Sequence, residues 1–121
     1  MKPEIKDAWV AALRSGKYEQ GRRTLRSIEN KYCCLGVLCD LYVKANPSAV
    51  WKLAGTYYEI HSNGGVLPEN VIAWAGVKNS VGGTFISPNE SEPISFIDAN
   101  DILMYNFNQI ADLIEKYADQ L

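Results

Sequence analysis

The sequence predicts an α+β fold in which terminal helices and a central buried Cys-rich helix pack on a small, mainly antiparallel sheet. Three observations predict it. Residues 32–42 are a strongly apolar run with a single charged residue, residues 106–117 have the spacing of an amphipathic helix, and short aromatic or β-branched segments between turn signals fill the middle of the chain. A length of 121 residues suits one core, so we expect one domain over residues 1–121.

Composition and charge argue against several functional classes. With 47% hydrophobic and 21% charged residues, the chain is typical of a folded globular protein and not of a disordered one. A net charge of −2 argues against broad nucleic-acid binding, for which a basic domain is expected. The longest apolar run is shorter than the stretch of about 20 residues that crosses a bilayer, so we expect no membrane partner.

The charges are unevenly distributed. Basic residues cluster in the first third of the chain, at Arg14, Lys17, Arg22, Arg23, Arg26 and Lys31. Acidic residues gather in the last third, at Glu90, Glu92, Asp98, Asp101, Asp112, Glu115 and Asp119. The basic cluster is either a patch that faces a small anion or a partner, or a solvated face of the domain.

The three cysteines are expected to be reduced and structural. Their number is odd, Cys33 and Cys34 are adjacent, and the first residues lack the apolar region of a secretion signal. This pattern favours free thiols in a cytosolic setting, where a buried cysteine behaves as a small hydrophobic residue.

The first half of the chain is expected to hold two helices with a hairpin between them. Pro3 and the spacing of Trp9 and Leu13 predict a helix over residues 3–15, which Gly16 ends. Residues 17–21 are expected to be a loop, residues 22–28 a short strand or extended segment, and residues 28–32 a hairpin turn. Residues 33–44 predict the central helix, which ends before Pro47, although a strand over residues 32–38 remains an alternative.

The second half is expected to alternate strands and helices. The predicted elements are a strand at 55–61, a turn at 62–65, a helix at 67–76, strands at 84–86 and 94–97, and a polar loop at 87–93 that is the best candidate for mobility. In the last helix, Asn106 and Gln109 have the spacing of a capping box. Its apolar stripe is expected to pack against the central run, and consists of Phe107, Ile110, Leu113, Ile114 and Tyr117.

One loop combines residues suited to binding a nucleotide-like anion. A tyrosine can stack on a base, a glycine lets a ligand approach the backbone, and arginines can bind a phosphate with paired hydrogen bonds. With the polar Asn-Asp pair near the last helix, this predicts a ligand-binding site lined by Tyr18, Gln20, Arg22, Arg23, Asn100 and Asp101. No glycine-rich nucleotide motif or other cofactor signature accompanies it, so no cofactor is predicted.

The cysteines, His61 and two aspartates raise catalytic and metal-binding alternatives. A cysteine-dependent hydrolase would use Cys34 or Cys33 as nucleophile and His61, the only histidine, as base. The cysteines and His61 lack the paired spacing of a zinc site, so no metal is predicted. Asp98 and Asp101 fit an acid–base or metal-binding pair, but ordinary turn chemistry is favoured for them.

Several motifs resemble a mostly uncharacterised family of small bacteriophage and prophage proteins. They are Trp9-x-x-Ala12-Leu13-Arg14-Ser15-Gly16-x-Tyr18-x-Gln20-Gly21, residues 32–40 (YCCLGVLCD), Leu67-Pro68 with Trp74-Ala75-Gly76, Asn100-Asp101 and residues 107–115 around Ile110-Ala111-Asp112-Leu113. Residues 43–62 and 77–93 carry none of the resemblance. The resemblance implies a phage origin and a place in the host bacterial cytoplasm, but no reaction.

The function expected from these features is that of a non-catalytic phage accessory protein. It would sequester a small anionic nucleotide-like signal or otherwise counter host defence. The alternatives are the cysteine-dependent hydrolase and a protein that inhibits a host protein by surface contact. Three tryptophans in a small domain leave room for one at an interface, so a homo-oligomer also remains open.

Overall fold

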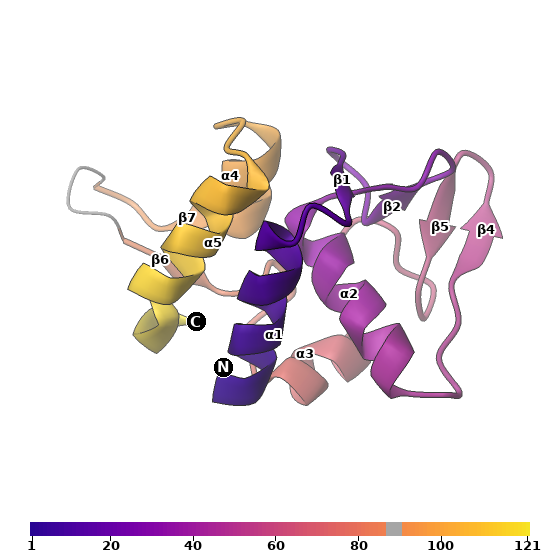
Figure 1. The fold of residues 1–121 in the computed structure, drawn as a ribbon, viewed down its shortest axis with the longest axis horizontal. Helices are drawn as coiled ribbons and strands as arrows, with labels where there is room; N and C mark the ends of the chain where they lie inside the picture. The colour runs from indigo at the N-terminus through magenta and orange to yellow at the C-terminus, as the bar shows by residue number, and fades with distance from the viewer. Residues whose placement is uncertain (87–90) are drawn as a thin grey trace.

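Residues 1–86 and 91–121, which the computed structural model describes, contain five α-helices and two small sheets (Figure 1). The predicted α+β class is therefore confirmed. The helices are α1 (Pro3–Arg14), α2 (Cys34–Ala45), α3 (Glu69–Ala75), α4 (Phe96–Asp101) and α5 (Phe107–Lys116), followed by a 3-10 helix, η1 (Ala118–Gln120).

The larger sheet has the strand order β1-β3-β2-β5-β4. Its strands are β1 (Glu19–Gln20), β2 (Arg26–Ser27), β3 (Lys31–Tyr32), β4 (Lys52–Ala54) and β5 (Tyr57–Glu59). β1 pairs with β3 in parallel, whereas the other pairs are antiparallel, as expected of a mainly antiparallel sheet. The strands β6 (Thr84–Phe85) and β7 (Ile94–Ser95) form a separate antiparallel pair.

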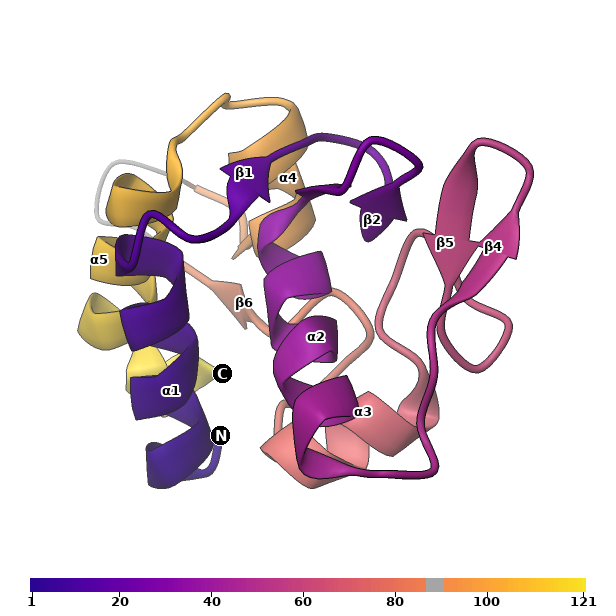
Figure 2. The same cartoon turned by 45° about the vertical axis from the view of Figure 1, so that its right-hand side comes forward.

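Helix α2 is the central element, with α1 on one side and strands β2, β5 and β4 on the other (Figure 2). It begins after Cys33, whose sulfur accepts a hydrogen bond from the Gly36 amide at 3.4 Å, and it ends at Asn46, which is extended before Pro47. The predicted helix over residues 33–44 is confirmed, and the alternative of a strand over residues 32–38 is wrong.

Gly36 explains how α2 can lie so close to the strand segment. A Cβ atom at Gly36 would lie 1.7 Å from the carbonyl oxygen of Leu25, just before β2. No side chain fits there, so a glycine inside this helix permits contact between helix and sheet at this point.

The terminal helices pack on each other more than the sequence suggested. Trp9 on α1 is fully buried and its indole Nε1 donates to the Cys34 carbonyl oxygen at 2.9 Å. Helix α5 has the predicted capping box at Asn106, and its apolar stripe packs chiefly against α1. The expectation that this stripe packs on the central run is wrong, because α1 lies between α5 and α2 (Figure 1).

Three further local predictions need correction. Glu19–Gln20 forms β1, although residues 17–21 were expected to be a loop. The predicted strand at 94–97 ends after Ser95, because the Ser95 hydroxyl accepts from the Asp98 amide at 3.1 Å and caps α4. Residues 98–101 are therefore helical and not a turn. The predicted polar loop at 87–93 lies partly outside the described residues, since 87–90 are not described.

Candidate functional site

The two segments predicted to share a site do lie against each other. The Gln20 side-chain amide donates to Asn100 Oδ1 at 2.9 Å and to the Tyr105 carbonyl oxygen at 2.9 Å. Asn100 Nδ2 donates in return to the Gly21 carbonyl oxygen at 3.0 Å. The strand β1 and the end of α4, about 80 residues apart in sequence, are thus joined by side-chain hydrogen bonds.

These hydrogen bonds point inward. Asn100 is fully buried, and its Oδ1 also accepts from the Cys34 amide at 3.2 Å. Asp101 Oδ1 accepts from the Arg23 amide at 3.0 Å and from Asn100 Nδ2 at 2.8 Å. We call the group formed by Gln20, Gly21, Arg23, Asn100 and Asp101 the polar clamp. Its polar atoms are used on one another, so the clamp connects elements of the fold instead of presenting those atoms to a ligand.

The two predicted arginines do not form a paired anion cradle. Arg22 Nε is buried and has no hydrogen-bond partner among the described residues, whereas the Arg23 residue is exposed. The arginine that lies among aromatic rings is Arg26, which is not one of the predicted site residues. Its guanidinium carbon is 4.0 Å from the centre of the Tyr58 ring and 5.6 Å from the Tyr32 ring.

Tyr18 belongs to a different group of side chains. Its hydroxyl donates to Asp40 Oδ2 and accepts from Lys44 Nζ at 3.1 Å, and Trp51 Nε1 donates to Asp40 Oδ1 at 3.0 Å. Burial acts to raise the pKa of Asp40, but these donors outweigh it and hold that pKa below its usual value. Burial raises the pKa of Tyr18, and the bond to Asp40 adds to the rise. We call Tyr18, Asp40, Lys44 and Trp51 the Asp40 cluster.

A hollow of about 330 Å³ lies beside Tyr18, between α1 and α2. It combines a tyrosine ring and apolar side chains with two lysines, and its lining residues are Ala11, Ala12, Ser15, Lys17, Tyr18, Leu41 and Lys44. Lys17 forms no ion pair with any residue that the structure describes. Lys44 lies in the last turn of α2, where a cation offsets the negative end of the helix dipole, and Lys17 lies just beyond the end of α1.

The cysteines are buried in the core around α2. Burial raises the pKa of the Cys33 thiol to about 12 and raises that of Cys34 well above its usual value. Cys34 Sγ lies 3.5 Å from the Phe96 carbonyl oxygen. A nucleophile needs an accessible thiolate, so this environment favours a structural role for the thiols.

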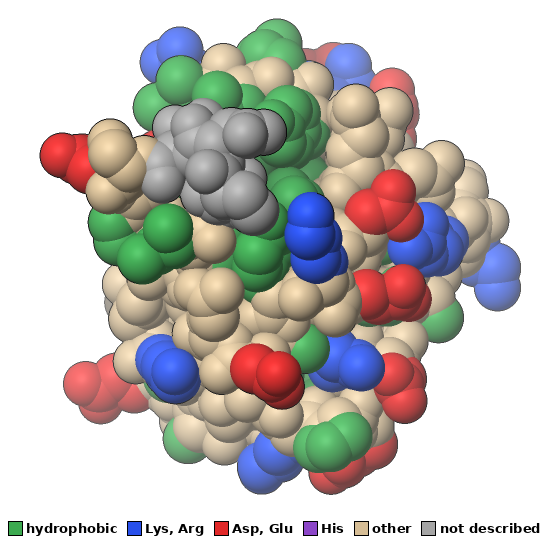
Figure 3. Space-filling model, turned by 90° about the vertical axis from the view of Figure 1, so that its left-hand side faces the viewer, with side chains coloured by type: hydrophobic (Ala, Val, Ile, Leu, Met, Phe, Trp, Pro, Cys, Tyr) green, Lys and Arg blue, Asp and Glu red, His purple; other side chains and the backbone are tan. Residues whose placement is uncertain are grey.

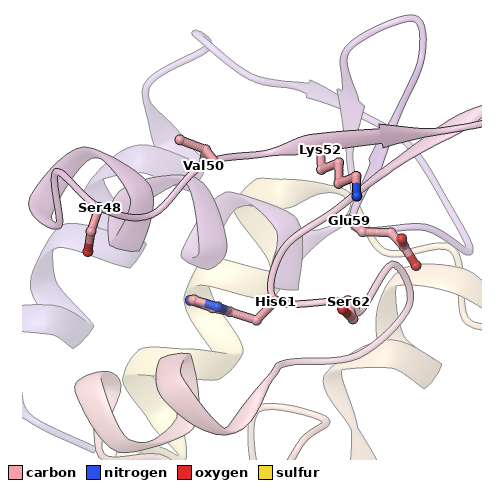
Figure 4. Close-up of a pocket in the computed structure, with 6 residues that line it drawn as sticks. All are labelled: Ser48, Val50, Lys52, Glu59, His61 and Ser62. Carbon is pink, nitrogen blue, oxygen red and sulfur yellow. The ribbon is translucent and has the colours of Figure 1, made fainter.

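His61 lies at a second hollow, of about 270 Å³ (Figure 4). The hollow is lined by Ser48, Val50, Lys52, Glu59, His61 and Ser62. His61 Nε2 is 3.2 Å from the Tyr42 hydroxyl, and none of the cysteines lines this hollow. His61 and Ser62 both have positive φ, at 48° and 67°, in a two-residue hairpin turn between Ile60 and Asn63.

An exposed apolar segment follows α4. Ile102, Leu103 and Met104 are exposed at 71%, 41% and 58%, although they are consecutive large hydrophobic residues. We call these three residues the apolar turn. Hydrophobic side chains gather on the upper part of the face that carries β6, β7 and α4 (Figure 3). An apolar surface of this kind is typical of a contact with another molecule.

The apolar turn is held in place by its own backbone and by the polar clamp. The amides of Ile102 and Leu103 donate to the Asp98 carbonyl oxygen at 2.9 and 2.8 Å, and the Tyr105 amide donates to the Ala99 carbonyl oxygen at 3.0 Å. The Tyr105 carbonyl oxygen accepts from Gln20 of the clamp. The residues predicted to bind a ligand therefore support an apolar surface next to them.

Comparison with known proteins identifies the family of the chain. A family model described as a domain of unknown function, DUF8296, matches residues 1–118. The chain belongs to DUF8296. No curated protein and no solved structure matches it.

The DUF8296 match includes every element of the candidate surfaces. The polar clamp, the Asp40 cluster and the apolar turn all lie within residues 1–118. Within the part of this DUF8296 chain that the structure describes, no three histidine, cysteine, aspartate or glutamate side chains are placed to hold a metal ion. None of the described helices is long and apolar enough to cross a membrane.

The apolar turn is visible in the sequence as a hydrophobic run, although it is not among the predicted site residues. Three large hydrophobic residues stand directly between a polar pair, Asn100-Asp101, and the capped start of α5 at Asn106. A hydrophobic run at an expected turn, where polar residues are usual, marks an exposed apolar surface.

Proposed function

We propose that this DUF8296 chain is a non-catalytic binding protein that acts by contact with another protein through its apolar turn. The observation that carries the proposal is the exposure of Ile102, Leu103 and Met104 at 71%, 41% and 58% on a backbone fixed by hydrogen bonds. Such residues lose contact with water when a partner covers them, which is the main favourable term in protein association.

The rigidity of the apolar turn supports the proposal. Met104 has a φ of 59°, which is unfavourable for a residue with a side chain, and hydrogen bonds on both sides of it maintain this conformation. A surface that is already ordered loses little conformational entropy when it binds. This order supports a preformed contact surface over a loop that must fold on a partner.

The biological setting of the proposal comes from the motifs in the sequence. Their resemblance to bacteriophage and prophage proteins supports an accessory protein that works in the cytoplasm of a host bacterium. The partner would then be a host protein, and binding would inhibit it, for example to counter a host defence. Inhibition by contact needs no catalytic residue in this chain.

The proposal is tested by comparing variants in affinity capture. Ile102→Ser combined with Met104→Asn removes the two most exposed side chains of the turn, and asparagine tolerates positive φ. We expect this variant to lose proteins that the unchanged chain captures from bacterial lysate, with affinity for the purified partner reduced about tenfold or more.

Val50→Ser is the matched control, since Val50 is 68% exposed and lies far along the chain from the turn. It should leave capture unchanged. Equal capture by all three proteins would contradict the proposal. The partner on the turn could also be a second copy of the chain. Light scattering of the purified chain detects that dimer by its mass.

A nucleotide-type anion is the second candidate ligand, favoured by the hollow beside Tyr18. There a half-buried ring and two lysines border a volume of about 330 Å³, which is in the range of small-molecule sites. Calorimetry with cyclic and ADP-ribose-type nucleotides would detect sequestration of such a signal. Lys17→Ala should weaken that binding and Lys78→Ala, outside the hollow, should not; an absence of heat with every nucleotide would remove this candidate.

A further inference from the structure

The apolar turn borders a hollow that is lined by an acidic side chain. The hollow measures about 260 Å³ and is lined by Ile94, Asp98, Ile102 and Leu103. Of the lining side chains that the structure describes, Ile94, Ile102 and Leu103 are aliphatic and Asp98 is polar. A site of this composition can accept a side chain with an apolar stem and a charged end.

The carboxylate of Asp98 is available for a partner. No hydrogen bond or ion pair within the described residues involves its side-chain oxygens. Asp101, one helical turn further on, is different because its Oδ1 accepts from the Arg23 amide and from Asn100. Asp112 is also paired, at 2.6 Å from Arg14.

The charged residues of the segment around Asp98 are also acidic. Between Lys78 and Lys116 the sequence has no lysine, arginine or histidine, and its acidic residues are at 90, 92, 98, 101, 112 and 115. Asp112 and Glu115 pair with Arg14, so the acidic group that a partner meets at the apolar turn is the carboxylate of Asp98, beside aliphatic side chains. Complementarity of charge therefore favours a cationic partner and disfavours an acidic one.

We infer that the partner is a protein segment with an arginine or lysine flanked by apolar residues, which places its cationic side chain in the Asp98 hollow. The inference rests on the proposed function of the apolar turn. The aliphatic stem of the cationic residue packs on Ile94, Ile102 and Leu103, and its charged end pairs with Asp98. The flanking apolar residues of the segment cover Met104 and the outer side of Ile102.

A membrane surface is a poorer occupant for the same site. Anionic lipid headgroups attract basic segments, whereas the charged side chain in this hollow, Asp98, is acidic. A protein segment can bring its positive charge to Asp98 and its apolar residues to the turn together, which a lipid surface of negative or zero net charge cannot.

The inference is tested with a library of random 12-residue peptides displayed on yeast and selected on the full-length chain. Peptides that also bind the variant Ile102→Ser with Met104→Asn are removed. We expect the remaining peptides to be enriched in arginine or lysine next to leucine, isoleucine or phenylalanine. For synthetic versions of these peptides, Asp98→Asn should weaken binding about tenfold or more and reduce its dependence on salt.

Asp119→Asn is the control, because Asp119 is an exposed aspartate that does not line the hollow. It should leave the affinity unchanged. If turn-dependent peptides lack cationic residues, or bind Asp98→Asn as well as the unchanged chain, the inference is overturned while the proposed contact through the turn stands.

Two other outcomes also overturn the inference. One is that no peptide depends on the turn, in which case the comparison of variants in lysate decides separately whether the proposed function survives. The other is that vesicles of phosphatidylcholine and phosphatidylglycerol bind the chain through the turn and the peptides do not. Circular dichroism of each variant shows that it is folded, so that loss of binding is not caused by unfolding.

Discussion

The helices and the larger sheet are stabilised in different ways. We call helices α1 to α5 the helical half of the molecule and strands β1 to β5 the sheet half. Helix α2 buries every residue from Cys34 to Asp40, and α1 and α5 bury their apolar faces against each other. In contrast, no residue of the strands β1 to β5 is buried. The sheet is held instead by hydrogen bonds and by contacts between Arg26 and aromatic rings. Burial of apolar area therefore stabilises one half, and specific pairs of polar and aromatic groups stabilise the other.

The two halves meet at Gly36, so a change there should have the largest effect. In Gly36→Ala the new methyl group would overlap the Leu25 carbonyl oxygen, which is backbone and cannot simply rotate away. We expect a loss of about 3 kcal/mol or more in the free energy of unfolding, measured by urea denaturation, despite the better helix propensity of alanine.

Gly65→Ala is the control for Gly36→Ala. No atom lies within 4 Å of a Cβ at Gly65, and its φ is not in the left-handed region. We expect this substitution to be neutral or slightly stabilising, because alanine reduces the entropy of the unfolded chain. A Gly36→Ala protein as stable as Gly65→Ala would show that helix and strand segment are not in close contact.

The Asp40 cluster joins α2 to the sheet half through polar groups, and its removal should have the next largest effect. Asp40→Asn retains the shape of the side chain but loses the charge that faces Tyr18, Trp51 and Lys44. We expect a loss of about 2 kcal/mol near pH 7, since a hydrogen bond to a charged group contributes about 1.5–3 kcal/mol. Asp7→Asn, with a side chain 75% exposed, should show no such loss.

The same variant makes a prediction about pH. The pKa of Asp40 is lowered in the folded state, so its contribution to stability is present above its unfolded pKa, near 4. The contribution is lost as the pH falls through the lowered pKa of the folded state. The difference in stability between the unchanged chain and Asp40→Asn should therefore shrink as the pH is taken below about 4. A difference that grows on acidification would mean that the pKa is raised.

Sequence patterns predicted most of the helices. Helices α1, α2, α3 and α5 have repeated apolar spacing or a clear start and stop, such as the capping box at Asn106. Helix α4 was missed because it has only six residues, although Ser95 and Asp98 have the spacing of a cap. The packing of α5 on α1 was also missed, because periodicity shows which face is buried but not which helix covers it.

The sheet half and the site depend on pairs that a single sequence does not show. The parallel pairing of β1 with β3 has no local pattern, because each strand has only two residues. Gln20 and Asn100 lie together, but nothing in the local sequence indicates that their side chains bond to each other. Side chains suited to ligand binding are equally suited to joining two segments, and only the geometry distinguishes these roles.

Arg26→Lys should have the smallest effect on stability. It tests whether the contacts of the Arg26 guanidinium stabilise the sheet half. The guanidinium lies over the Tyr58 ring, and its Nε and Nη2 donate to Asn30 Oδ1 at 3.0 and 2.7 Å. Lysine keeps the charge but loses the flat stacking and the paired hydrogen bond, so we expect a loss of about 1 kcal/mol in thermal or urea unfolding.

Arg23→Lys is the matched control for Arg26→Lys. Only the backbone amide of Arg23 takes part in the polar clamp. The Arg23→Lys variant should therefore be as stable as the unchanged chain. If both substitutions are silent, the aromatic contacts of Arg26 contribute nothing measurable, and the sheet half must depend on the Asp40 cluster and the strand hydrogen bonds alone. If only Arg26→Lys is destabilising, the guanidinium is part of what holds the unburied strands to one another.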